Sequence, residues 1–551
     1  MNAKKYIMPP SVGLTNRQWP GRVTTQAPVW CSVDLRDGNQ ALPVPMTVPQ
    51  KIEMFGVLVG CGFKEVEVGF PAASPTEYEF VRRLIEEDLI PCDVTIQVLV
   101  QAREDLIRRT VDALSGARRV IIHMYNSTSP SQRRIVFGLE KPDIVKMAVQ
   151  GTQWVKKYSV KLTEAGTEVL FQYSPESFSA TESDFAVDIC EAVMKEWNPT
   201  PQRKIIFNLP ETVEVATPNI YADQVEWFCQ NITRRDCIII CVHGHNDRGT
   251  GIAATELAML AGAERVEGTL FGNGERTGNT DIIAVALNLL IQGVDPMLDF
   301  SGLDRIREIY ERCTGMKVSP RQPYSGELVF TAFSGSHQDA IRKGLLARAE
   351  NPDGIWDIPY LVMDPHDVGR EYKEVIRVNG QSGKGGIAYL LEQECGVSLP
   401  KDLQREFGAV AGKKIDSLGR EVTGDDLKQM FWDEYINHKG REVSYRLDRF
   451  SAVDNVDKHR CYTTFRIGKN SYDLAGDGNG PIDAFINALA KAGVSVRVLN
   501  QSEHALGQGQ EASAIAYIQL RFANGDVCWG AGVDTSIELA SIKAVFSALN
   551  R

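Results

Sequence analysis

The fold is decided by one stretch, Cys237-Ile238-Ile239-Ile240-Cys241-Val242-His243-Gly244-His245-Asn246-Asp247. Its first part is apolar and β-branched, which is typical of a short buried strand. Alternate side chains of a strand point to the same side, so His243 and His245 share one face where the strand ends. Two convergent neutral imidazoles suit a divalent metal, whereas the alternative is a pair of exposed loop histidines. Because the chain has only 8 histidines among 551 residues, we favour a metal site.

A regular alternation of strands and helices surrounds this stretch. Eight segments read as strands: 29–33, 65–70, 94–100, 119–125, 168–173, 204–208, 237–241 and 265–270. A helical pattern follows each of them, and eight such units over about 250 residues are typical of a (β/α)8 barrel. An open doubly wound sheet is the alternative, but the regularity of the eight units favours closure. The predicted fold class is therefore α/β, with a TIM barrel.

Polar residues cluster at the predicted carboxyl ends of these strands, where the active site of such a barrel lies. They are Arg36, Asp37, Glu176, Thr212, His243, His245 and the segment 273–279. In a closed barrel the first strand neighbours the eighth and the eighth neighbours the seventh, so Asp37 can share an ion with the two histidines. Arg36 is expected either to stabilise developing negative charge or to form a salt bridge at the rim. Glu176 is either a general base or a solvated carboxylate.

The rest of the chain divides by composition and pattern. We expect an irregular arm at 1–27, the catalytic barrel at 28–324, helical linker subdomains at 325–388 and 389–438, and a final domain at 439–551. The final domain reads as two βββα units of about 50 residues that share one core, which indicates an internal repeat and a ligand-sensing module.

Composition excludes several classes of protein. The net charge of -11 argues against nucleic acid as a partner. The sequence shows neither a signal peptide nor an apolar run of about 18 residues, so we expect no membrane span. The 11 cysteines form no CxxC pair. Reduced thiols in a cytoplasmic protein are the simplest explanation.

Three segments carry a resemblance to a known family: 34–40, 243–247 and 272–279. They resemble the Claisen-type acyltransferases and lyases that are built on metal-binding barrels. From about residue 10 to the end, the chain is similar to the long form of the α-isopropylmalate synthases. This resemblance implies condensation of acetyl-CoA with 2-oxoisovalerate and hydrolysis of the thioester to give 2-isopropylmalate, the first step of leucine biosynthesis.

The resemblance also implies the roles of individual residues. The divalent metal, Mg²⁺ in the first place with Mn²⁺ or Zn²⁺ as alternatives, would be held by Asp37, His243, His245 and Asn279. The catalytic residues would be Arg36, Glu176, His337 and Tyr372. Substrate would be contacted by Thr212, Ser174, His123, Tyr125, Asn208 and Glu275. His337 and Tyr372 would reach the barrel of the other subunit, which implies a homodimer.

The C-terminal repeat resembles the leucine-feedback domain of the same family. Leucine would be bound by Gly478, Asn479, Gly480, Ile482, Val498 and Ala505. The glycine-rich turn at 478–480 offers backbone N–H groups to a carboxylate near a helix start. The chain departs from the family pattern at Asn500-Gln501, where other members carry aromatic residues. Leucine regulation is therefore a separate expectation from catalysis.

Three other functions fit parts of the sequence. A citramalate or homocitrate synthase would keep the fold and change the oxoacid, and a lyase would use the same metal site. A non-catalytic amino-acid sensor would retain a barrel without activity. The intact set of charged and histidine residues argues against the sensor, and the βββα tail argues against homocitrate synthase.

Overall fold

The computed structural model describes residues 5, 12–374, 384–418, 422–455, 458–507 and 512–551. Internal contacts divide the chain into two units, Met1–Phe330 with Val362–Tyr372, and Thr331–Leu361 with Lys373–Arg551. The segment expected as one linker subdomain, 325–388, is thus divided between them. Arg370 gives the physical reason. Its guanidinium donates to Asp304 at 2.8 Å and to the Gly326 carbonyl at 2.8 Å, which ties its segment to the first unit.

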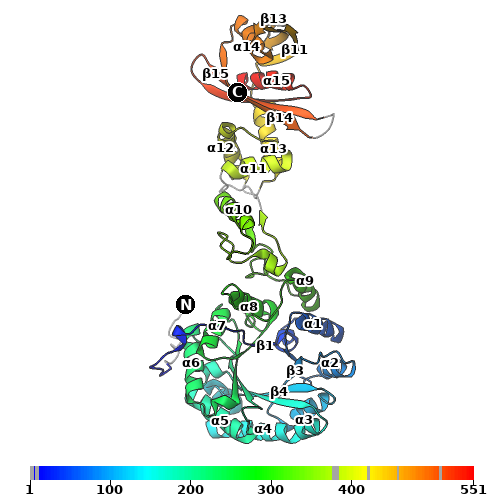
Figure 1. Ribbon diagram of the computed structural model, residues 1–551, viewed down its shortest axis with the longest axis vertical. Coiled ribbons are helices and arrows are strands. Elements are labelled where there is room, and N and C mark those ends of the chain that lie inside the picture. Colours follow the sequence, from blue (N-terminus) through cyan, green and yellow to red (C-terminus); the bar gives the residue numbers. More distant parts are fainter. Residues whose placement is uncertain (1–4, 6–11, 375–383, 419–421, 456–457, 508–511) are drawn as a thin grey trace. The chain divides into compact units, whose positions relative to one another are not determined.

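The first unit contains a closed barrel of eight parallel strands in sequence order, which confirms the predicted fold class (Figure 1). The strands are β1 (Val29–Ser32), β2 (Glu65–Gly69), β3 (Thr95–Gln101), β4 (Arg119–Ser127), β5 (Glu168–Glu176), β6 (Ile205–Glu211), β7 (Ile238–Gly244) and β8 (Arg265–Gly268). β1 pairs with β8 over Val29–Ser32, which closes the barrel. This closure brings the end of β1 beside the ends of β8 and β7.

Helices surround the strands, as Figure 1 shows. They are α1 (Val48–Gly60), α2 (Pro75–Glu86), α3 (Glu104–Ala113), α4 (Lys141–Glu164), α5 (Ser183–Trp197), α6 (Pro218–Asn231), α7 (Gly251–Ala261), α8 (Ile282–Leu290) and α9 (Leu303–Thr314). Local sequence sets their starts: the Ser74 hydroxyl accepts from the Glu77 N–H, and the Asp281 carboxylate accepts from the Ile283 N–H. Arg17, which lies in the predicted N-terminal arm, forms an ion pair of 2.7 Å with the buried Asp223 of α6.

The interior of the barrel is unusually polar. Branched aliphatic side chains commonly fill such interiors, whereas here Glu67, Gln97, Gln172, Arg265 and Glu267 are buried. Buried charges are tolerated when they are paired and hydrogen-bonded, and these residues contact one another below the strand ends. This polar layer was not predicted from the sequence.

In the second unit, helices precede the C-terminal repeat. They are α10 (Gly335–Glu350), α11 (Lys384–Cys395), α12 (Lys401–Leu418) and α13 (Gly424–Phe431). Two short strands that the sequence did not predict, β9 (Thr331–Ala332) and β10 (Lys373–Glu374), pair in parallel. Two residues are too few to give a detectable alternation. Apolar residues of α11–α13 form one buried cluster with Ile515, Tyr517, Trp529 and Ala531 of the final domain.

The final domain has the predicted order of two βββα units. The first contains β11 (Tyr445–Asn455), β12 (Lys458–Ile467), β13 (Asn470–Gly478) and α14 (Pro481–Lys491). The second contains β14 (Val496–Leu506), β15 (Ser513–Phe522), β16 (Val527–Asp534) and α15 (Ile537–Leu549). Residues of both sheets and both helices form a common core. Helix and strand approach closely, since a Cβ at Gly530 would lie 2.2 Å from the Ala544 carbonyl oxygen.

Among the described residues, no helix combines the length and the apolar character needed to cross a bilayer.

Candidate active site

A pocket of about 150 Å³ opens at the carboxyl ends of the barrel strands. Its lining includes eleven residues predicted from the sequence: Arg36, Asp37, His123, Tyr125, Ser174, Glu176, Asn208, Thr212, His243, His245 and Glu275. Of the other predictions, Asn279 lies behind the lining and contacts Asp37. His337 and Tyr372 come from later parts of the chain and are described below.

Asp37, His243 and His245 form a compact cluster in this pocket. One ligand atom from each lies within 4.8 Å of the others. His243 Nε2 is 3.1 Å and His245 Nε2 is 3.6 Å from the same Asp37 oxygen, Oδ2. A π-helical turn, η3 (Asp34–Gly38), places Asp37 at the end of β1. Its N–H donates to the Val33 carbonyl at 2.9 Å, so the carboxylate projects from a hydrogen-bonded backbone.

Close packing explains the glycines around the two histidines. A Cβ at Gly244 would lie 2.7 Å from the Thr280 hydroxyl, so only glycine fits between His243 and His245 without displacement. Gly278 has a φ of +97° and leaves no room for a side chain, because a Cβ would lie 1.9 Å from the Gly272 carbonyl. The loop can therefore bring Asn279 against the cluster, where its backbone forms a bridge with His245.

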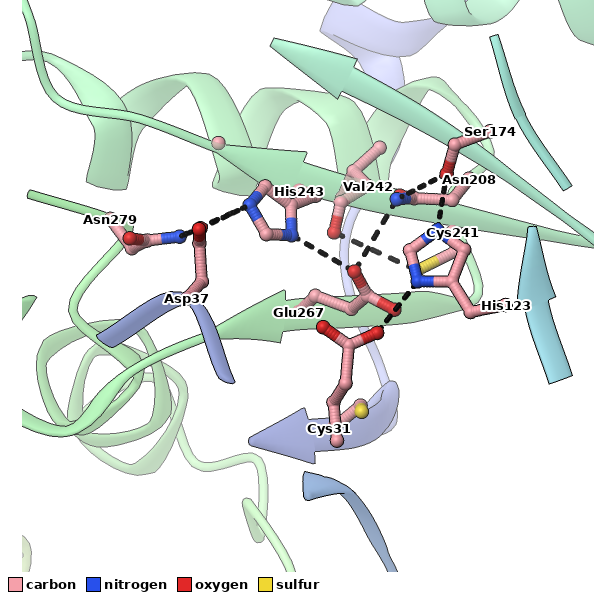
Figure 2. A network of polar contacts seen from close by, with 12 residues as sticks. Cys31, Asp37, His123, Ser174, Asn208, Cys241, Val242, His243, Glu267 and Asn279 are labelled. Atoms are coloured by element: carbon pink, nitrogen blue, oxygen red, sulfur yellow. Dashed lines mark hydrogen bonds and ion pairs between the residues drawn. The ribbon is translucent and has the colours of Figure 1, made fainter. Parts of the chain in front are cut away.

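Asn279 contacts both the carboxylate and one imidazole. Its Nδ2 donates to Asp37 Oδ2 at 2.8 Å and lies 3.1 Å from His243 Nε2 (Figure 2). Its Oδ1 is buried and has no hydrogen-bond partner, and the same is true of His245 Nδ1. Buried polar atoms are normally satisfied. Both residues beside Asp37 thus keep one polar atom that the described chain does not satisfy.

Burial and neighbouring charges shift the pKa values of all three residues of the cluster. Burial raises the pKa of Asp37, but Arg36 and His243 outweigh burial and hold that pKa well below its usual range. Burial, followed by the charge on His243, lowers the pKa of His245 to about 4. Burial also lowers the pKa of His243, but hydrogen bonds to Asp37 and Glu267 raise it to about 9 overall. A cation bound at Nε2 would compete with this second proton.

The donor set fits a divalent metal. A carboxylate with two imidazoles, and no thiolate, suits Mg²⁺, Mn²⁺ or Zn²⁺. The orphaned Oδ1 of Asn279 adds one oxygen beside the cluster, after a rotation of its amide. The pocket leaves space next to Asp37 for a substrate oxygen. The buried cluster is thus compatible with a divalent metal site.

Other predicted residues stand around the cluster with defined partners. Arg36 pairs with Asp37 at 2.7 Å and also with Glu67. The Glu176 carboxylate accepts from the Ser127 hydroxyl. The Thr212 hydroxyl accepts from the Ser177 N–H at 2.9 Å.

The floor of the pocket is a chain of hydrogen bonds. His123 Nε2 lies 2.7 Å from the Ser174 hydroxyl, which also accepts from Asn208 Nδ2 at 3.0 Å. Nearer the mouth, Gln101 donates to the Tyr125 hydroxyl at 3.0 Å. Glu275 accepts from Gln40, also at 3.0 Å.

A second group of possible metal ligands lies below the floor, namely Glu67, His123 and Glu267. Its centre is taken by the amide of Gln97. The Gln97 Nε2 lies 2.6 Å from Glu67 Oε2, 2.9 Å from Glu267 Oε1 and 3.3 Å from His123 Nδ1. An amide N–H thus satisfies these oxygens without a cation.

Glu67, Arg265 and Glu267 were not predicted from the sequence. One signal was present, since charged residues alternate with valine in Glu65-Val66-Glu67-Val68 and Arg265-Val266-Glu267. In a barrel strand this alternation places the charges inside and the valines against the helices.

His337 and Tyr372 belong to different units. His337 lies in the first turn of α10, is exposed, and stacks on Tyr360 with ring centroids 3.9 Å apart. Tyr372 ends the segment Val362–Tyr372, which belongs to the barrel unit. The sequence had predicted both residues within one subdomain, 325–388. The structure instead places them in different units.

The residues predicted to bind leucine lie around the start of α14 and on β14. Ile482 and Val498 pack against the same core cluster, whereas Ala505 is exposed on β14. In the glycine-rich turn, the Asn479 N–H donates to Asp483 Oδ2 at 2.9 Å. This backbone donor is thus engaged by the chain itself.

Comparisons with known proteins agree with this architecture. Residues 27–309 match the HMGL-like family, 327–392 match the α-isopropylmalate synthase post-catalytic domain-like family, and 421–551 match the LeuA allosteric (dimerisation) domain. The fold and the cluster at its strand ends define a barrel enzyme of the HMGL-like class, compatible with a divalent metal.

Full-length relatives narrow this class. The chain is 52% identical to 2-isopropylmalate synthase of Parafrankia sp. (strain EAN1pec), over 100% of the chain and 98% of that protein. It is 52% identical to the Clostridium acetobutylicum enzyme of the same name, over 99% of each chain. For the Pseudomonas entomophila enzyme the identity is also 52%, over 100% of the chain and 97% of that protein. The chain belongs to the 2-isopropylmalate synthase family, the acyltransferases of leucine biosynthesis, which confirms the resemblance seen in the sequence.

Proposed function

We propose that the chain condenses acetyl-CoA with 2-oxoisovalerate and hydrolyses the thioester, and that the pocket around Asp37 is where this happens. The observation that carries the proposal is the buried Asp37–His243–His245 cluster at the open end of the barrel. The chain's family membership supplies the reaction, and the cluster supplies the electrophilic site that the reaction needs.

We assign Asp37, His243 and His245 as ligands of the metal, with Mg²⁺ as the first choice and Asn279 Oδ1 in or beside the coordination shell. When bound, the metal acts as a Lewis acid toward the ketone of the oxoacid. Arg36 keeps Asp37 ionised through their 2.7 Å ion pair and presents positive charge toward the oxygen that becomes negative. Thr212 is assigned to the oxoacid carboxylate.

The methyl group of a thioester is a weak acid, so its deprotonation needs a positioned base. We assign this work to Glu176 and His337 together, with Tyr372 as their partner. Glu176 lines the pocket and is held by the Ser127 hydroxyl. The pocket residues assigned to substrate contact are His123, Tyr125, Ser174, Asn208 and Glu275. The 11 free cysteines agree with the proposed cytoplasmic location.

An assay of CoA release tests the reaction and its rivals together. Acetyl-CoA is offered with 2-oxoisovalerate, pyruvate and 2-oxoglutarate in turn, and free thiol is followed with a chromogenic reagent. We expect kcat/KM to be highest with 2-oxoisovalerate. A preference for pyruvate or 2-oxoglutarate would instead assign the chain as a citramalate or homocitrate synthase. The absence of thiol release with every oxoacid would favour a lyase or a sensor.

We also propose that leucine inhibits by binding at the turn 478–480 of the final domain, and that this domain supports a homodimer. Gly480 is the best position for a test, because it has an extended φ of -167° and a Cβ there would meet nothing within 4 Å. Gly480→Val can therefore fold, yet it places a branched side chain beside the proposed carboxylate site.

We expect Gly480→Val to lose most of the inhibition by leucine. Since allosteric coupling is typically worth about 1–3 kcal/mol, the loss should be several-fold to about a hundredfold. The measurement is the leucine concentration for half inhibition, relative to each variant's own uninhibited rate. Gly480→Ala, which adds one methyl group, is the matched control and should change this value much less. Unchanged inhibition of Gly480→Val would place leucine elsewhere.

A further inference from the structure

The interior of the barrel contains one carboxylate with an unusually complete set of partners. Glu267 of β8 is fully buried. Its Oε1 accepts from Arg265 Nη1 at 2.7 Å, Gln172 Nε2 at 2.8 Å and Gln97 Nε2 at 2.9 Å. Its Oε2 accepts from His243 Nδ1 at 2.9 Å and Asn208 Nδ2 at 3.3 Å (Figure 2). These donors come from five different strands, so the position of this carboxylate is fixed by the barrel itself.

The partners of Glu267 decide which nitrogen of His243 carries the proton. A carboxylate can only accept, so Nδ1 of His243 must donate, and its lone pair is at Nε2 when the ring is neutral. Nε2 is the nitrogen that faces Asp37, at 3.1 Å. Histidines that bind metals commonly donate their other N–H to such a partner, and loss of the partner typically costs about 10- to 100-fold in metal affinity.

We propose that Glu267 is a positioning residue that fixes His243 in the Nδ1–H form, with Nε2 free for the metal. Arg265 supports this arrangement. Its guanidinium can only donate hydrogen bonds, so it keeps Glu267 an acceptor, and it is itself held by an ion pair of 2.5 Å with Glu65. The Glu267 oxygen that accepts from His243, Oε2, also accepts from Asn208, and Asn208 donates to Ser174 as well. Glu267 thus connects the metal side of the pocket to its floor. The inference rests on the proposed metal role of His243.

The isosteric change Glu267→Gln has a defined consequence at the atomic level. Three N–H donors, one of them a guanidinium, converge on the Oε1 position, so the amide oxygen should take that position. The amide NH₂ group then faces His243 Nδ1 and donates to it. The imidazole is forced into the Nε2–H form, and the proton points at Asp37, where the ligand lone pair is needed.

The test is the affinity of the metal-free full-length protein for Mn²⁺, used as a spectroscopic probe and displaced by Mg²⁺. We expect the Kd of Glu267→Gln to rise about 10- to 100-fold. Glu226→Gln is the matched control, because Glu226 of α6 is also buried and its partners, the Gln18 N–H at 3.1 Å and Arg22 at 3.8 Å, lie outside the pocket. Its Kd should change by less than about 3-fold. Glu267→Asp retains the charge but withdraws the oxygen from Nδ1, so we expect an intermediate Kd even if the glutamine variant does not fold.

The outcomes separate this inference from the proposed function. If His243→Ala binds Mn²⁺ as tightly as the parent, the proposed metal site itself is wrong. If His243→Ala binds weakly but both Glu267→Gln and Glu267→Asp retain the parental Kd, the positioning role of Glu267 is wrong. Equal weakening by Glu226→Gln and Glu267→Gln would also overturn it, since the effect would then be a general loss of buried charge.

Discussion

Replacing Asp37 by alanine should lower kcat by about 10³-fold or more while leaving the chain folded. Asp37 is the one carboxylate that both histidines of the cluster approach, through the single oxygen Oδ2. Without it, a cation would face two imidazoles and the positive charge of Arg36. Lewis-acid stabilisation of developing negative charge is worth several kcal/mol, and each 1.36 kcal/mol corresponds to a factor of ten in rate.

Three measurements make this expectation specific. Metal content after dialysis should fall in Asp37→Ala, the parent should lose turnover on chelation and regain it with Mg²⁺ or Mn²⁺, and thermal unfolding should show that the variant is folded. Asp105→Ala on α3 is a control at an exposed aspartate of the same barrel, and it should retain parental kcat. Full activity of a thoroughly chelated parent with no detectable metal would contradict the proposal.

The sequence predicted the barrel well because its signals are local. Most strands carry an apolar run rich in β-branched residues and are followed by polar residues, so the strands and their carboxyl ends are both visible without tertiary information. Closure then follows from the count of units, and it brings Asp37, just after β1, to the two histidines at the end of β7. The two histidines were found for the same reason, since an HxH at a strand end places both rings on one face.

The buried network was not predicted because its members meet only in the tertiary structure. Glu267 and Arg265 read as ordinary polar positions of a short strand, and only the closed barrel brings Gln97 of β3 and Gln172 of β5 to the same carboxylate. The assignment of Val362–Tyr372 to the barrel unit was missed for a similar reason. It depends on Arg370 reaching Asp304, 66 residues away in sequence.

His337→Ala is expected to lower kcat by about 10²- to 10⁴-fold, the usual contribution of a general base. The barrel itself favours a base that comes from outside it, because each imidazole that lines the pocket already has a partner within the barrel. His243 and His245 face Asp37, and His123 lies between Glu67 and Ser174. Two further carboxylates line the pocket, and both already accept a hydrogen bond: Glu176 from Ser127 and Glu275 from Gln40. His337 is exposed on α10, where its ring stacks on Tyr360, so its imidazole remains accessible from solvent.

The family resemblance implies that His337 serves the pocket of the other subunit, and mixing two inactive variants tests this directly. In a dimer of one Asp37→Ala chain and one His337→Ala chain, action in trans leaves one of the two sites whole, whereas action in cis leaves none. Random mixing makes half of the dimers hybrid, so action in trans should restore about one quarter of parental kcat. Each variant mixed with itself is the control and should stay inactive. Verified hybrids without activity would show that His337 acts within its own chain. A His337→Ala variant that is active by itself would remove the residue from catalysis and leave the proton transfer to Glu176.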